Sequence, residues 1–297
     1  MIGGSSRLGR LRTDGIRIGT RGSALALAQA GWVAERLPGE VELVPIQTSS
    51  STADKSRFVK EIEEALLAGD VDLAVHSAKD VPGDLPEGLT IVGVPEREDP
   101  LDALCGAASL DELPSGAAVG TASLRRRAQL AALRPDLEVR ELRGNVDTRL
   151  RRLEEGGFDA IVLARAGLVR LGRGDEGAPL EELVPAPGQG CLALEARAGG
   201  EEVARAAAAL TDPAALTALT AERALVTALG ATCDTPIGAF AQPAGDRLRL
   251  TAFLGHPDGS HWIRDELEGD PADPAALGEA VATRLASAGA DALLDVR

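Results

Sequence analysis

The sequence predicts an α/β protein in which one α/β domain is inserted into another, followed by a small α+β domain. Before residue 212, short apolar stretches that favour β-strands alternate with helical stretches. Two proline-containing crossings, at 95–100 and 185–190, interrupt this alternation. The composition changes again from residue 212 onward. With 297 residues, the chain is also too long for one ordinary hydrophobic core.

The first predicted domain follows a loose Gly-, Ser- and Arg-rich tail at 1–13. The expected elements are a strand at 16–18, a helix at about 24–37, a strand at 41–46, a helix at about 57–67 and a strand at 89–94. Thr20, Arg21 and Ser23 lie where the first strand meets the first helix. Free backbone N–H groups and the helix dipole favour an anion there, although many such junctions bind nothing.

The stretch 71–82, VDLAVHSAKDVP, lies between that second helix and the strand at 89–94. Its alternating apolar residues suit a core strand, and polar side chains, including Lys79 and Asp80, crowd the strand's carboxyl end. Ligands bind at the carboxyl ends of strands in open α/β sheets. A shielded Asp beside a Lys can hold a charged intermediate or move a proton, whereas in a solvated loop the two form an ordinary ion pair.

The inserted domain carries arginines at successive strand-to-helix junctions. We expect strands at 117–120 and 137–144, helices at 121–133 and 145–156, and a strand with a short helix at 159–172. Between residues 125 and 170 there are 11 Arg and no Lys against 7 acidic residues, within a chain of net charge −15. Because Arg offers a fixed fork of donors to carboxylates and phosphates, this basic segment indicates a site for small anions.

Composition argues against several other classes of protein. The strongly acidic net charge argues against general nucleic-acid binding. No apolar run reaches membrane-spanning length and no signal-peptide core is visible, so we expect a cytoplasmic protein without membrane contact. The cysteines, Cys105, Cys191 and Cys233, form no C-x-x-C pair and predict neither a disulfide framework nor a metal site. We expect Cys105 and Cys191 to be inert, whereas Cys233 lies in a loop and is a candidate functional thiol.

The expected domains are 14–96 with 190–211, then the inserted 100–185, then 212–297. In the last, a capped helix at 212–229 precedes a Gly-rich loop with a strand, a hairpin turning at Asp258-Gly259, and a mostly helical segment at 274–294. Two crossings between the first two domains allow a cleft that opens and closes.

Taken together, the motifs resemble the porphobilinogen deaminase family over nearly the whole chain from Arg17. The matching segments, in order, are GTRGSALALAQ, FVKEIEEALL, VDLAVHSAKDVP, PEREDP, GTASLRRRAQL, LRGNVDTRL, DAIVLARAGLVRLG, PGQG, TAERA and CDTPIGAFA. The resemblance implies two periplasmic-binding-protein-like (type II) α/β domains and a third domain that carries the cofactor cysteine.

The resemblance also implies residue roles. Cys233 would carry a covalent dipyrromethane cofactor through a thioether, and Asp80 would be the catalytic carboxylate. Residues implied to bind the acetate and propionate groups of cofactor and substrate are Arg21, Ser23, Lys79, Thr121, Ser123, Arg125, Arg126, Arg143, Arg149 and Arg170. Lys55 matches a basic residue near the family's active-site loop.

The implied reaction is a transferase step of tetrapyrrole (haem) biosynthesis. Porphobilinogen loses ammonia to give a cationic azafulvene, which a carboxylate can stabilise, and the α-carbon of the growing chain then attacks. Four rounds and a hydrolysis release hydroxymethylbilane. Each ring brings two carboxylates, which the arginine-rich segment suits.

One segment departs from the family pattern. The family has a longer glycine-containing segment where this chain has QTSSSTADKSR at 47–57, so shielding of the site and the role of Lys55 are open. The alternatives are a family member of reduced activity and a non-catalytic anion-binding protein of the same two-domain type. We expect a monomer whose partner is the small-molecule substrate.

Overall fold

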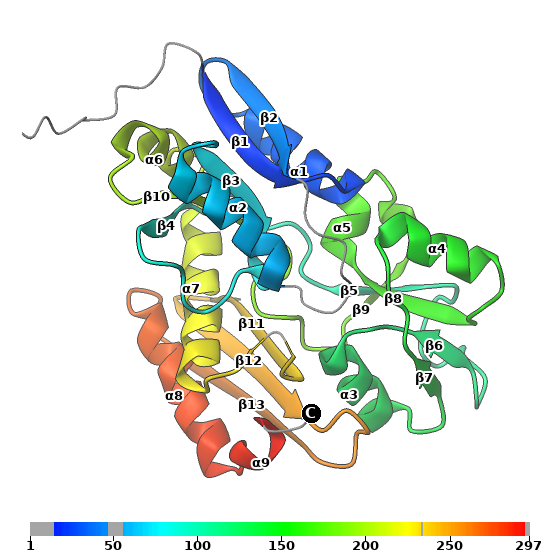
Figure 1. The fold of residues 1–297 in the computed structure, drawn as a ribbon. Coiled ribbons are helices and arrows are strands. Elements are labelled where there is room, and N and C mark those ends of the chain that lie inside the picture. Colours follow the sequence, from blue (N-terminus) through cyan, green and yellow to red (C-terminus); the bar gives the residue numbers. More distant parts are fainter. Residues whose placement is uncertain (1–14, 47–55, 233, 295–297) are drawn as a thin grey trace, which may run out of the picture.

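The computed structural model describes residues 15–46, 56–232 and 234–294. These residues form two five-stranded mixed sheets and one three-stranded sheet, each with its own helices (Figure 1). The predicted α/β class, with two α/β units and a small α+β unit, is therefore confirmed. Within the described ranges, none of the helices is both long and apolar enough to cross a membrane.

The first sheet has the strand order β2-β1-β3-β10-β4. Its strands are β1 (Ile16–Arg21), β2 (Val41–Ile46), β3 (Leu73–Ser77), β4 (Leu89–Gly93) and β10 (Leu192–Arg197). β1 runs parallel to β2 and β3, whereas β10 runs antiparallel to β3 and β4. The helices of this unit are α1 (Ala24–Ala34), α2 (Ser56–Ala68) and α6 (Glu201–Ala208). One of its strands thus comes from the far side of the inserted segment.

The second sheet repeats this arrangement with the order β7-β6-β8-β5-β9. Its strands are β5 (Asp102–Cys105), β6 (Ala118–Gly120), β7 (Glu138–Arg140), β8 (Ala160–Ala164) and β9 (Ala178–Leu180). β6 is parallel to β7 and β8, and β5 is antiparallel to β8 and β9. Its helices are α3 (Leu124–Leu133), α4 (Val146–Glu154) and α5 (Arg165–Arg170), with the 3₁₀ turn η2 (Gly174–Glu176) before β9.

The third sheet is antiparallel and packs against two helices. Its strands are β11 (Ile237–Ala244), β12 (Arg247–Gly255) and β13 (Trp262–Gly269), and its helices are α7 (Pro213–Ala228), α8 (Pro274–Ser287) and α9 (Asp291–Leu294). β12 and β13 form the predicted hairpin around Asp258-Gly259. α7 begins at the predicted cap, since the Asp212 side chain accepts a hydrogen bond from Ala215 N.

Aliphatic side chains fill the three cores, as the scarcity of aromatic residues requires. Ile18, Leu73 and Leu194 are fully buried in the first unit, and Leu104 and Leu130 in the second. Fully burying one such side chain contributes about 1.5–3 kcal/mol, and these contacts hold the strand ends in fixed positions.

Three elements were not predicted, and several were predicted too long, such as the helix expected at 24–37, which ends at Ala34. β5 and β9 are short, and each carries a residue untypical of a buried strand, Asp102 and Pro179 respectively. α6 has only eight residues. The expected strand at 137–144 narrows to Glu138–Arg140, because it is an edge strand that pairs only with β6 among the described strands.

The two crossings lie side by side. Glu98 N donates to Gly190 O at 3.2 Å, and Gly190 has φ +91°. A Cβ at that position would collide with the carbonyl of Glu98, so only glycine allows this approach. The paired crossings carry the chain between the first two sheets and place residues 95–100 and 185–190 next to the strand ends described below.

Candidate active site

The candidate site begins at the carboxyl end of β3. The predicted strand is confirmed, and the 3₁₀ turn η1 (Ala78–Asp80) follows it directly. Ala78 N donates to Cys191 O at 3.0 Å, which fixes this turn against the second crossing. Asp80 is half-buried, and from the described residues no hydrogen bond or ion pair engages its carboxylate.

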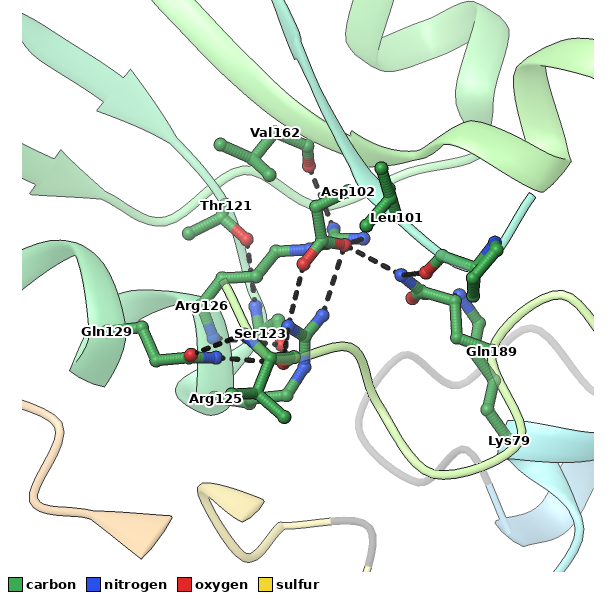
Figure 2. A network of polar contacts seen from close by, with 12 residues as sticks. Lys79, Leu101, Asp102, Thr121, Ser123, Arg125, Arg126, Gln129, Val162 and Gln189 are labelled. Carbon is green, nitrogen blue, oxygen red and sulfur yellow. Dashed lines mark hydrogen bonds and ion pairs between the residues drawn. The ribbon is translucent and has the colours of Figure 1, made fainter. Parts of the chain in front are cut away.

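Lys79 leaves the same turn towards the second sheet. Its Nζ donates to Gln189 Oε1 at 3.2 Å (Figure 2). Some of the side chain is exposed, but protein atoms crowd around it, and this desolvation lowers the pKa of Lys79 to about 8. Asp80 and Asp102 favour the charged form, whereas Arg125 and Arg126 oppose it. Lys79 is therefore a cation in a place that already contains positive charge.

Arg125 and Arg126 begin α3, and an acidic residue of this chain binds both. Asp102, on β5, is fully buried and accepts hydrogen bonds from Arg125 Nη1 at 2.6 Å and Arg126 Nη2 at 2.7 Å (Figure 2). The remaining donors go mostly to carbonyls: Arg125 Nη1 also donates to Val184 O, and Arg126 Nη1 to Val162 O. The sequence predicts that these arginines bind ligand carboxylates, and in the structure both also contact the internal carboxylate of Asp102.

The hydroxyl side chains predicted for binding have local partners. Ser23 is the N-cap of α1 and accepts from Ala26 N, and Ser123 is the N-cap of α3 and accepts from Arg126 N. Thr121 Oγ1 accepts from Ser123 N at 3.2 Å. These contacts explain why Ser and Thr stand at the two junctions, since N-caps satisfy free helical N–H groups.

Arg143 and Arg149 extend the positive region along α4. Arg149 Nε donates to Gly144 O at 2.8 Å, and burial together with Arg126 and Arg143 lowers the pKa of Arg149 to about 10. Arg143 is exposed and pairs with Glu141 at 2.7 Å. Arg126 therefore repels both Lys79 and Arg149, and Arg143 repels Arg149.

Arg170 and Arg21 lie towards the first sheet. Arg170 Nη2 donates to Gly190 O at 2.7 Å, and burial lowers the pKa of Arg170. Arg21 ends β1 immediately before α1, and α1 contacts α5, the helix that ends at Arg170. The first and second units thus contact each other close to Arg21 and Arg170, one predicted binding cation from each unit.

Sequence reasoning missed two residues of this network, Asp102 and Gln189. Asp102 stands in LDALC, an apolar stretch directly after a crossing. Because a buried charge needs a partner, an acid in such a stretch indicates an internal cation that binds it. Gln189 stands in PGQG, within the crossing at 185–190, and the sequence alone assigns its side chain no role. Both are fully or nearly fully buried and link the two units (Figure 2).

The three cysteines divide as follows. Cys105 and Cys191 are buried, and burial raises the pKa of the Cys105 thiol to about 11 and that of Cys191 to about 12. Such thiols are poor nucleophiles near neutral pH. Cys233 and Lys55 lie outside the described residues. In the part of the chain that is described, no group of three His, Cys, Asp or Glu side chains could hold a metal ion.

Comparisons with known proteins give consistent matches. Residues 16–205 match the family model described as "Porphobilinogen deaminase, dipyromethane cofactor binding domain", and residues 216–287 match its C-terminal domain. The porphobilinogen deaminase of Roseiflexus castenholzii is 48% identical over 300 residues, covering 95% of this chain and 99% of that protein. That of Thermus thermophilus is 50% identical over 276 residues, covering 88% and 92%.

Among solved structures, a periplasmic substrate-binding protein of an ABC transporter from Coxiella burnetii is 16% identical with a TM-score of 0.42, covering 68% of this chain and 94% of that one. The first family model alone matches well over half of the sequence, and the relatives align almost end to end. The chain belongs to the porphobilinogen deaminase family.

Proposed function

We propose that this chain condenses four porphobilinogen molecules stepwise, with loss of ammonia, and releases hydroxymethylbilane. Membership of the family makes it a porphobilinogen deaminase, a transferase of tetrapyrrole biosynthesis with a dipyrromethane cofactor. The residue roles rest on one observation: Lys79, a desolvated cation near Arg125 and Arg126, adjoins Asp80, a carboxylate that accepts no hydrogen bond from a described residue.

Charge explains why this region suits the substrate. Lys79 and Arg149 both have pKa values lowered by burial and by neighbouring guanidinium groups, so the site contains more positive charge than its own acids compensate. Every porphobilinogen ring brings two carboxylates, which would relieve this repulsion. Arg21, Arg143 and Arg170 would extend the binding surface over several rings. Arg125 and Arg126 would act mainly through their field, because Asp102 occupies most of their donors.

Asp80 is the proposed catalytic residue. Its carboxylate would stabilise the cation that forms when porphobilinogen loses its amine, and it would guide a proton to the leaving ammonia. The η1 turn holds Asp80 beside Lys79, so the acid and a carboxylate-binding cation come from adjacent positions. This arrangement can bind the acidic side chains of a ring while its aminomethyl carbon faces Asp80.

The donor set also fits the cofactor. A dipyrromethane with acetate and propionate side chains needs cationic donors, and Lys79, Arg143 and Arg149 would supply them. When bound, the cofactor supplies the free pyrrole α-carbon from which elongation starts. We propose that its thioether attachment is at Cys233, four positions before Ile237 in the sequence.

The domain division proposed with this function is 14–96 with 190–211, then 100–185, then 212–297. The three separate sheets and the paired crossings support it. We further propose a cytoplasmic monomer that acts on its small-molecule substrate without nucleic acid, in line with its strongly acidic charge.

Substitution of Asp80 tests the proposed catalytic role. Asp80→Asn keeps the size of the side chain and removes its charge, so we expect an unchanged fold and a loss of turnover of 10²-fold or more, roughly the contribution of a positioned acid–base group. Asp84→Asn, at an exposed acid four positions later, is the matched control and should keep normal turnover. Near-normal production of hydroxymethylbilane by Asp80→Asn would remove Asp80 from its role. Carboxylate binding without turnover by the wild-type chain would favour the non-catalytic alternative.

A further inference from the structure

Gln189 lies at the centre of the contacts between the two sheets. It belongs to the second crossing and only 1% of its surface is exposed. Its Nε2 donates to Asp102 Oδ1 at 2.9 Å and to Pro100 O at 2.8 Å, and its Oε1 accepts from Lys79 Nζ at 3.2 Å (Figure 2). One amide thus contacts a strand of the second unit, the first crossing and the proposed binding cation.

The surroundings allow only one orientation of this amide. Asp102 is an anion that two arginines hold, and the Pro100 carbonyl can only accept, so both must face the NH₂ side of the amide. The amide oxygen must then face Lys79, whose ammonium can only donate. A flipped amide would place its oxygen against two acceptors and its NH₂ against an ammonium, so that neither end of the buried amide would have a hydrogen-bond partner.

We propose that Gln189 is a positioning residue for Lys79: the Asp102 carboxylate fixes the amide, and the amide oxygen holds the Lys79 ammonium at the site. The catalytic significance of this position rests on the proposed function, in which Lys79 binds substrate carboxylates. Lys79 extends from the first unit and Asp102 lies in the second, so the amide makes the position of this cation depend on how the two units are joined.

The charges around Lys79 give the proposal a measurable consequence. Asp80 and Asp102 stabilise its ammonium, Arg125 and Arg126 destabilise it, and Gln189 supplies its hydrogen-bond acceptor. Without that acceptor the ammonium stays desolvated beside two guanidinium groups. A hydrogen bond to a charged group favours the charged form, so its loss should lower the pKa of Lys79 by about one pH unit or more.

The test is the titration of Lys79 in Gln189→Met, which keeps the length of the side chain and removes both amide groups. The chain has lysines only at 55, 60 and 79, so trace acetylation with acetic anhydride across pH, read by peptide mass spectrometry, resolves each one. Lys60 is exposed and serves as the internal reference. We expect the midpoint of Lys79 reactivity to fall from about 8 by about one pH unit in this variant, with Lys60 unchanged.

Gln129→Met is the matched control. Gln129 is also buried, and its amide bonds both Val184 N and Val184 O without contacting Lys79. It should lose stability like Gln189→Met but leave the midpoint of Lys79 unchanged. If Gln189→Met does not fold, Gln189→Glu replaces it. Its protonated carboxyl can still donate to Asp102 and accept from Lys79, so the midpoint should not fall.

The inference would be overturned by an unchanged Lys79 midpoint in Gln189→Met, or by an equal fall in Gln129→Met. For Gln189→Glu, a fall of one pH unit would do the same.

The kinetics separate this failure from that of the proposed function. We expect Gln189→Met to raise KM for porphobilinogen more than it lowers kcat, most strongly above pH 7. If the Lys79 midpoint falls in Gln189→Met but the wild-type chain shows no turnover, Gln189 still positions Lys79 and the proposed function is refuted instead.

Discussion

The two five-stranded sheets each place one fully buried acid on the equivalent antiparallel strand, but they surround it differently. Asp102 on β5 accepts five hydrogen bonds, from Arg125, Arg126 and Gln189. Glu195 on β10 has His76 Nε2 at 3.1 Å, and its Oε1 has no described partner. Glu63 of α2, which lies near Glu195, is also buried with an unpartnered Oε1.

This difference separates two uses of a buried carboxylate. The arginines hold the pKa of Asp102 well below its usual range despite burial, so it remains an anion that organises cations at the proposed site. Burial raises the pKa of Glu63, and the charge of Glu195 raises it further, so the first centre favours retention of a proton. The second sheet thus stabilises a fixed negative charge next to the candidate active site. The first sheet instead buries two acids, Glu63 and Glu195, each with one carboxyl oxygen that lacks a described hydrogen-bond partner.

Removing the charge of Asp102 should have the largest effect on stability. Asp102→Asn leaves Arg125 and Arg126 buried without a counter-ion, which should lower the free energy of unfolding by about 3–5 kcal/mol. Glu195→Gln is the matched control at the equivalent strand and should cost only about 1 kcal/mol, the scale of one hydrogen bond. Urea unfolding of both variants at pH 7 makes the comparison, and equal losses would abolish the distinction between the two centres.

The pH dependence of the free energy of unfolding should have opposite signs for Asp102 and Glu63. We expect this effect to be smaller than that of Asp102→Asn. The folded pKa of Asp102 is depressed, so its contribution is present above the unfolded pKa of about 4 and is lost as pH falls through the folded value. The folded pKa of Glu63 is raised, so its contribution is complete below about 4.3 and is lost as pH rises through the folded value.

Glu63→Gln removes the second contribution. Relative to wild type, this variant should gain about 1 kcal/mol between pH 4 and pH 8, because the wild type must bury a charge as Glu63 ionises. Urea midpoints at several pH values provide the measurement. Parallel curves for the variant and the wild type would contradict the raised pKa of Glu63.

Particular residues show how far the sequence leads. The strand before Lys79 and Asp80, the helices that begin near Ser23 and Ser123, and the β12–β13 hairpin follow from local periodicity and turn chemistry. The partner of Arg125 does not, because Asp102 is 23 positions away and lies in a strand that a short, acid-containing stretch does not reveal. The sequence predicts cations at one sheet edge, but only three-dimensional packing decides which of them an internal acid neutralises.

The same limit applies to Gln189. PGQG indicates a turn, and the positive φ of Gly188 and Gly190 agrees with that interpretation. The glutamine, however, contacts Pro100 and Lys79, which lie 89 and 110 positions before it in the sequence. No local pattern encodes such a contact, since it depends on the pairing of the two crossings.

The intact mass of the purified, denatured chain, before and after brief incubation with porphobilinogen, tests the central claim most directly. The account predicts a starting mass above that of the sequence by two condensed pyrrole units, then a ladder of one-ring additions. Cys233→Ser should lack both, whereas Cys105→Ser and Cys191→Ser should keep them. A wild-type chain at its bare sequence mass, with no ladder after porphobilinogen is added, would contradict a tethered pyrrole chain built among these cations.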